Sequence, residues 1–170
     1  MDHDFMVSAI DGYPNSRADD SLAQYLEKYW IDRESLEHVW APLFESVFRR
    51  SSGRASVADN FVVDISQGGI LFTKDEFLEF VARAKEVGAT RFAVVEDIGQ
   101  RDWRALKRFD FFRFSYPVTV SWEEMARSSI LAQDVFERPI RCFFVITDNG
   151  KLGKYANNDA DPPYDLVFHI

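Results

Sequence analysis

The stretch that most constrains the fold is an unbroken run of five apolar residues, Cys142–Ile146. Most of them are β-branched or aromatic, which is typical of a strand that is covered on both faces. Pro139 lies at the start of this strand, where its missing N–H disturbs a sheet least. The sequence Asp148-Asn149-Gly150 follows and predicts a tight turn, because Asn and Gly tolerate positive φ. We therefore expect a strand in the middle of a sheet.

Helical periodicity dominates the N-terminal part of the chain. We expect Asp20 to cap a helix with apolar residues at every third or fourth position. A second pattern of this kind runs from Asp32 or Glu34 to Arg49-Arg50. Pro42 is expected to kink or split this second helix, because proline lacks the N–H and crowds the carbonyl four residues earlier. The small residues of 51–58 predict a loop.

Two capping boxes indicate further helices. Thr73 and Glu76 have the spacing that satisfies two backbone N–H groups in the first helical turn, and Gly88 is suited to the end of that helix. Ser121 and Glu124 have the same spacing and predict a helix that continues to about residue 129. Residues 101–108 contain four basic residues together with Trp103 and Leu106, and we interpret them as a short amphipathic helix.

Strand-like segments occupy much of the remainder. They are residues 61–65, 91–95, 109–120 and 164–170, together with Cys142–Ile146 and its hairpin partner. The segments on either side of the Thr73 helix predict either a βαβ-like unit or a hairpin that precedes the helix. The fold class we expect is a single α+β domain over residues 1–170, with residues 1–18 as a loose N-terminal arm. Its N-terminal helices should pack on a mixed or mainly antiparallel sheet of about five strands.

Composition and charge restrict the classes of function. The chain has 170 residues and a net charge of −8, and a phosphate backbone repels such a surface, so we expect no direct nucleic-acid partner. A basic protein is a better candidate, although acidity for solubility alone explains the charge equally well. No apolar stretch approaches the ~20 residues of a membrane helix, and the acidic start differs from a secretory signal. We expect a cytoplasmic protein that binds no membrane.

The sequence contains no clustered set of catalytic or metal-binding residues. Its three histidines, His3, His38 and His169, are far apart, and Cys142 is the only cysteine. A zinc site needs several such ligands. Gly68-Gly69 is not followed by the rest of a phosphate-binding loop. The acids and amides of residues 157–161 lack the glycine and the terminal glutamate of an EF-hand calcium loop. We therefore predict no catalytic residue, no cofactor and no metal.

The C-terminal part resembles a family of bacterial proteins. The residues that carry the resemblance are Trp122-Glu-Glu-Met, the segment 136–145, the segment 148–155 and Asn158-Asp159. This part looks like the immunity proteins of contact-dependent growth inhibition and related polymorphic toxin systems. The resemblance covers about the last fifty residues and leaves out the N-terminal helices. It implies a cognate inhibitor that binds one toxin domain, often a basic nuclease, and blocks its active site. It transfers no site residue, since interfaces differ between cognate pairs.

We expect the toxin interface to lie where acidic loops follow the strands, provided that these strands share one end of the sheet. The predicted interface residues are Glu96, Asp97, Asp148, Tyr155, Asp159, Asp161, Tyr164 and Asp165. Two other functions stay open. One is a small cytoplasmic enzyme that uses exposed carboxylates such as Glu96, Asp97 or Asp148, although neighbours in a strand point to opposite faces. The other is an adaptor without a toxin partner.

Overall fold

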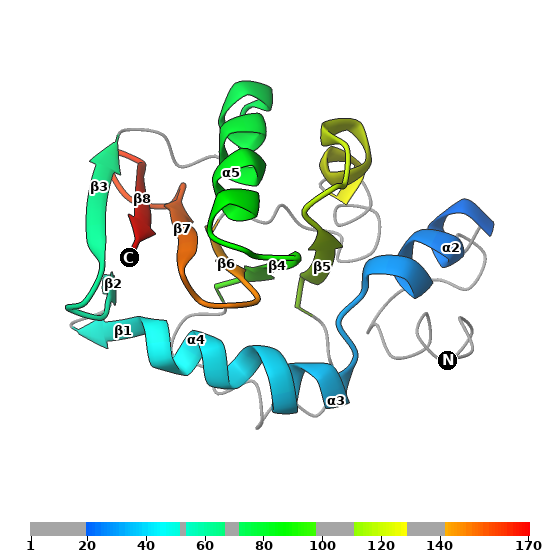
Figure 1. The fold of residues 1–170 in the computed structure, drawn as a ribbon, viewed down its shortest axis with the longest axis horizontal. Coiled ribbons are helices and arrows are strands. Elements are labelled where there is room, and N and C mark those ends of the chain that lie inside the picture. Colours follow the sequence, from blue (N-terminus) through cyan, green and yellow to red (C-terminus); the bar gives the residue numbers. More distant parts are fainter. Residues whose placement is uncertain (1–19, 52–53, 67–71, 98–110, 129–141) are drawn as a thin grey trace.

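A six-stranded antiparallel sheet forms the centre of the protein in a computed structural model that describes residues 20–51, 54–66, 72–97, 111–128 and 142–170. The strand order is β3-β8-β7-β6-β4-β5 (Figure 1). The strands are β3 (Val62–Ser66), β4 (Arg91–Glu96), β5 (Arg113–Pro117), β6 (Cys142–Thr147), β7 (Leu152–Asn157) and β8 (Tyr164–His169). The predicted α+β class is confirmed, with one strand more in the main sheet than expected.

The predicted central strand is β6, which pairs with β4 on one side and β7 on the other. Phe143 and Val145 are buried on one face of the sheet and Ile146 on the other, so both faces of this strand are covered, as expected. Cys142 and Phe144 are only half-buried, contrary to the expectation that both faces are buried along the whole strand. Phe144 packs against the rings of Phe48 and Tyr155, which cover it only in part.

Helix α5 (Lys74–Glu86) covers one face of the sheet (Figure 1). Thr73 and Glu76 form the predicted capping box, with the Glu76 N–H donating to Thr73 Oγ1 at 3.2 Å and the Thr73 N–H donating to Glu76 Oε2 at 2.9 Å. Gly88 has φ of +80°, the left-handed conformation expected after the helix. Phe77, Phe80 and other apolar residues of α5 pack in one cluster with strands β4 to β7.

Helix α2 (Asp20–Tyr29) packs against β5, where Tyr25, Leu26 and Tyr29 join the same cluster as α5. Asp20 is itself helical and is not the cap that we expected. The residue before it lies outside the described part of the chain, together with the predicted N-terminal arm, the Gly68-Gly69 turn and the helix predicted at 101–108. Residues 122–128 are helical, and the Glu124 N–H donates to Ser121 Oγ as the second capping box predicts.

The opposite face is covered by a helix that changes its pitch. It consists of α3 (Arg33–Ser35), the π-helix η2 (Leu36–Trp40) and α4 (Ala41–Val47), and Asp32 caps its start. The wide turn ends with the Ala41 N–H donating to the Leu36 carbonyl, immediately before Pro42. A wider turn moves the proline ring away from the carbonyl with which it would clash. The predicted disturbance at Pro42 is thus a change of helix type.

The predicted end of this helix and the loop that follows it are both wrong. The helix ends at Val47, and the next residues form β1 (Phe48–Ser51), which pairs with β2 (Arg54–Val57) in a separate two-stranded sheet. Phe48 fits the apolar spacing of the helix because its ring is in contact with Phe144 and Phe168 of the main sheet. It makes these contacts from strand β1 and not from a helix. Periodicity alone does not separate these two outcomes.

Strands β3 and β4 belong to the same sheet and run in the same direction, and the chain passes from one to the other through α5. Strands β8, β7 and β6 lie between β3 and β4, and each neighbouring pair is antiparallel. The arrangement is therefore βαβ-like, with a wide crossover, as the first predicted possibility has it. The residues of the alternative hairpin, 67–71, lie outside the described part of the chain. None of the helices in the described ranges has the length and apolar character needed to cross a membrane.

A substitution at each face of the sheet tests this architecture. Phe92 is fully buried beneath α5, so we expect Phe92→Ala to lower the free energy of unfolding by about 3–5 kcal/mol through the cavity that it creates. Phe144 is half-buried, so Phe144→Ala should cost less, about 1–3 kcal/mol. Denaturant unfolding of both variants measures the difference. A larger loss at Phe144 than at Phe92 would contradict the difference in burial between the two side chains.

Candidate functional site

Most of the predicted interface residues meet at one end of the sheet, which we call the acidic end. It comprises the end of β4, the start of β6, the end of β7 and the start of β8, because these strands are antiparallel. The Asp97 N–H donates to the Cys142 carbonyl at 2.9 Å, and Cys142 Sγ lies 3.7 Å from Asp159 Oδ2. Tyr164 pairs with Asn157 in the neighbouring strand.

The side chains at the acidic end differ in accessibility. Asp159 and Asp161 are exposed, and Tyr164 is half-buried. Asp97 is half-buried and accepts a hydrogen bond of 2.9 Å from the Tyr155 hydroxyl. The exposed acids are therefore in the loop between β7 and β8, and this loop offers a partner two carboxylates beside an aromatic ring.

Four of the predicted interface residues do not present an accessible carboxylate or aromatic ring at the acidic end. Asp148 lies at the opposite end of the sheet, where its carboxylate accepts from the Thr90 hydroxyl at 2.6 Å. It is separated because β4 and β6 run in opposite directions. Glu96 is buried and accepts from the Phe112 N–H at 3.1 Å. Tyr155 and Asp165 are also buried, so neither ring nor carboxylate is presented to solvent.

Asp165 belongs instead to a buried ion pair that sequence reasoning missed. Its Oδ2 lies 3.2 Å from Lys154 Nζ, and only 3% of each side chain is exposed. Glu76 Oε2 is 3.7 Å from the same ammonium, which also lies 4.8 Å from the centre of the Phe72 ring. The only sequence signal was a charged residue within each of two apolar strands, β7 and β8.

The ion pair lines a pocket of about 220 Å³ between α5 and the strands β3, β8 and β7. The charged residues that line it are Asp64, Glu76, Glu79, Arg83, Lys154 and Asp165. Carboxylates outnumber cations, so the pocket is suited to a positively charged group. We call it the α5 pocket. No group of three or more His, Cys, Asp or Glu residues in the described segments is placed to hold a metal ion.

The thiol at the acidic end is not an activated nucleophile. Partial burial is the main cause that raises the pKa of Cys142, and the charge of Asp159 contributes to the increase. A higher pKa leaves less thiolate at neutral pH and makes the thiol less reactive. Cys142 Sγ donates to Asn157 Oδ1 at 3.3 Å, which is consistent with a structural role.

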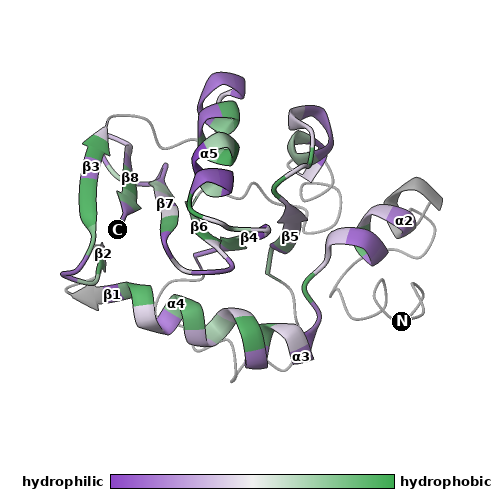
Figure 2. Ribbon diagram, in the orientation of Figure 1, coloured by the Kyte–Doolittle hydropathy of each residue, from purple (hydrophilic) through white to green (hydrophobic). Residues whose placement is uncertain are grey.

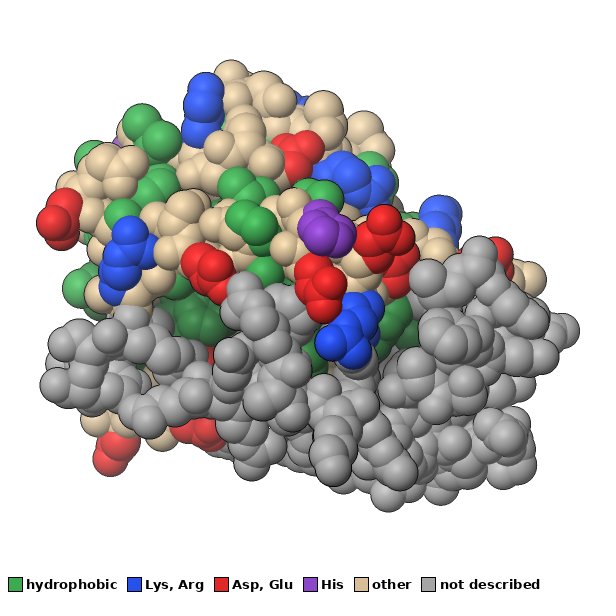
Figure 3. All heavy atoms as spheres, turned by 90° about the horizontal axis from the view of Figure 1, so that it is seen from below, with side chains coloured by type: hydrophobic (Ala, Val, Ile, Leu, Met, Phe, Trp, Pro, Cys, Tyr) green, Lys and Arg blue, Asp and Glu red, His purple; other side chains and the backbone are tan. Residues whose placement is uncertain are grey.

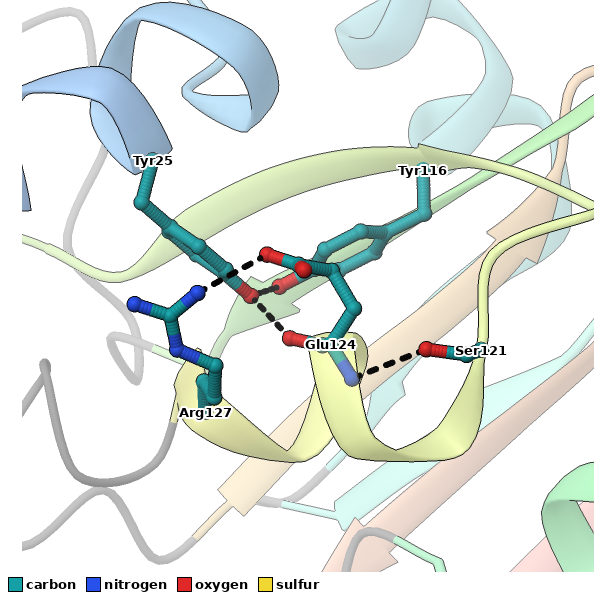
Figure 4. Close-up of polar contacts among 5 residues, drawn as sticks. All are labelled: Tyr25, Tyr116, Ser121, Glu124 and Arg127. Carbon is teal, nitrogen blue, oxygen red and sulfur yellow. Dashed lines mark hydrogen bonds and ion pairs between the residues drawn. The ribbon is translucent and has the colours of Figure 1, made fainter. Parts of the chain in front are cut away.

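A second buried polar group joins α2, β5 and the helix at 122–128 (Figure 4). The hydroxyls of Tyr25 and Tyr116 are 2.8 Å apart, and Tyr25 also donates to the Glu124 carbonyl at 2.9 Å. Burial raises the pKa of both tyrosines well above the ordinary value of about 10. The helical periodicity after Asp20 could not reveal this contact, because the polar partner of Tyr25 lies 91 positions away.

The face formed by α3, η2 and α4 offers no comparable feature. In its described part, acidic and basic side chains are interspersed with hydrophobic ones, without a wide area of one charge (Figure 3). Arg33 and Glu37 form an exposed ion pair there at 3.0 Å. Such a mixed surface is ordinary for a globular protein and suggests no ligand.

The sequence matches no protein-family model, and comparison with curated proteins and with solved structures likewise gives no match. The acidic end and the α5 pocket are therefore interpreted from their own chemistry.

Removing one partner of the buried ion pair should destabilise the protein strongly. Asp165→Ala removes the carboxylate that lies 3.2 Å from the buried Lys154 ammonium, and we expect it to lower the free energy of unfolding by about 3–5 kcal/mol. The double variant Lys154→Met, Asp165→Ala should recover much of this loss, because no buried charge remains. Urea unfolding at pH 7 measures both. A double variant less stable than Asp165→Ala would contradict the buried pairing.

The two raised tyrosine pKa values predict a loss of stability in alkali. The folded protein retains protons that the unfolded chain releases above pH 10, so this contribution is complete below pH 10 and falls as the pH rises. Tyr116→Phe should therefore show a shallower decline of unfolding free energy between about pH 9.5 and 11 than the wild type. Tyr164→Phe, at a half-buried ring outside this network, is the control. If the unfolding free energy of the wild type and of Tyr116→Phe fell equally steeply over this pH range, the prediction would be refuted.

Proposed function

We propose that this chain is a cytoplasmic immunity protein, which binds a basic toxin domain one to one and blocks its active site. The observation that carries the proposal is the pair of exposed carboxylates, Asp159 and Asp161, beside the half-buried ring of Tyr164. No Lys or Arg follows Lys154 in the sequence.

The acidic end supports this function through two separate effects. Exposed carboxylates at the edge of an interface attract a cationic partner and raise the rate of association. A small number of partly buried aromatic residues supplies most of the energy that holds such complexes together. Tyr164 is in a position to act in this way, whereas the hydroxyl of Tyr155 is engaged with Asp97 inside the fold. A nuclease, whose substrate cleft is cationic, fits the charge.

The enzyme alternative receives less support from these contacts. It depended on Glu96, Asp97 and Asp148, and each of these carboxylates accepts a hydrogen bond that joins two elements of the fold. An adaptor without a toxin partner uses the same surface and differs only in what it binds. Binding to a toxin domain, if a neighbouring gene encodes one, separates these two possibilities.

The test is the association rate with that toxin domain at low and high salt. In the double variant Asp159→Ala, Asp161→Ala, we expect the rate to fall about three- to tenfold at low ionic strength and to change little at 0.5 M salt. The matched control is Glu27→Ala, Glu86→Ala, which removes two exposed acids from α2 and α5. An equal effect of both pairs would assign the rate to net charge, and no binding by the wild type would reject the immunity function.

A further inference from the structure

The two edge strands of the main sheet, β5 and β3, differ in what pairs with them. At the β5 edge, the Ile31 N–H donates to the Arg113 carbonyl at 3.3 Å, and Trp30 forms a β-bridge with Phe114. The Arg113 guanidinium also donates to the Ile31 carbonyl at 2.7 Å. This edge is closed by the segment after α2. Among the described strands, β3 at the other edge pairs only with β8 (Figure 1).

Strand β3 is exposed along its whole length and is apolar at three of its five positions. Val62, Val63 and Ile65 are 54%, 37% and 73% exposed, and Figure 2 shows this apolar character at the outer side of the sheet. An edge strand presents alternate N–H and C=O groups that accept a further strand. Proteins usually protect such edges with charged side chains, above all lysine, with proline or with a bulge. Strand β3 contains one charged residue, Asp64, and neither lysine nor proline.

Each face of β3 borders a hollow of different character. Val63 and Ile65 line a groove of about 630 Å³, together with Pro163, Tyr164 and Leu166. On the opposite face, Asp64 lines the α5 pocket, in which carboxylates outnumber cations. Successive residues of a strand point to opposite faces. A strand added beside β3 would therefore direct alternate side chains toward an apolar groove and toward an acidic pocket.

We propose that β3 accepts an extended segment of a basic partner as an added strand, with apolar and cationic residues in alternation. The apolar residues lie over the groove of Val63 and Ile65, and the lysines or arginines lie toward Asp64 and the carboxylates of the α5 pocket. This deepens the proposed function by naming where and in which conformation the partner binds. The groove includes Asp161 and Tyr164, so the added strand would be continuous with the acidic end.

Charge favours such a partner over a second copy of this chain. An antiparallel pair of β3 strands centred on Asp64 would place two carboxylates directly opposite each other, which is unfavourable. The two copies would also bring together chains that each carry a net charge of −8. A basic segment meets the same edge with attraction in place of repulsion.

The test uses a blocked peptide of alternating lysine and valine, Lys-Val-Lys-Val-Lys-Val-Lys, and a scrambled peptide of equal composition that lacks the alternation. Binding is followed by NMR of backbone amides. We expect the alternating peptide to perturb residues 62–66 and to bind at least fivefold more tightly than the scrambled one. The variant Ile65→Lys should weaken binding at least tenfold, because it removes an apolar contact and adds a repelling charge. Val39→Lys, at an exposed valine remote from the sheet edge, is the matched control and should bind as the wild type does.

Each outcome decides the proposal. Equal binding of the two peptides, no binding at 1 mM peptide, or equal loss in Ile65→Lys and Val39→Lys would overturn it. A wild-type dimer that Ile65→Lys abolishes would also overturn it, in favour of a second copy. Competition with the toxin domain keeps the two proposals separate. If the peptide binds β3 but no toxin domain binds the wild type, the surface stands and the immunity function fails. If the toxin binds Ile65→Lys unchanged, the immunity function stands and strand addition fails.

Discussion

Burial of the β4–β6 pair on both faces is the constraint on which the rest of this structure depends. Phe92 and Val94 are covered by the α5 cluster, and Ala93 and Ile146 are covered by the helix that contains η2. A strand pair buried in this way needs a layer on each side, because its backbone and side chains leave no polar face. The N-terminal helices, the crossover helix and the β1–β2 hairpin all serve this requirement.

The elements that sequence reasoning found correctly are those with local signals. The capping box of Thr73 and Glu76, the left-handed Gly88 and the turn at Gly150 depend only on nearby residues. The element that it missed is the β1–β2 hairpin, because Arg49 and its neighbours continue a helical pattern whose contacts are made to distant strands. The π-helix before Pro42 is a similar case, since the sequence predicts a disturbance but not its form.

The candidate site was predictable in composition but not in arrangement. The sequence indicated the acids after the strands, yet only the strand order decides which of them meet. Asp97 and Asp148 both follow strands, and they lie at opposite ends because those strands are antiparallel. The contact of Lys154 with Asp165 depends on the register of β7 and β8, which no local pattern determines. For the same reason, the sequence did not indicate that β3 lies at an edge of the sheet with one side exposed.

The position of β3 has a consequence for how the chain reaches this structure. The hairpins of β6, β7 and β8 join strands that are consecutive in sequence, whereas β3 comes from the first half of the chain to pair with β8. Contacts between distant segments form late, because closing a long loop costs entropy. During folding, β8 is therefore an open edge that β3 of the same chain or of a neighbouring chain can fill. We therefore expect refolding at high protein concentration to favour exchange of β3 between chains, with native pairing at every strand.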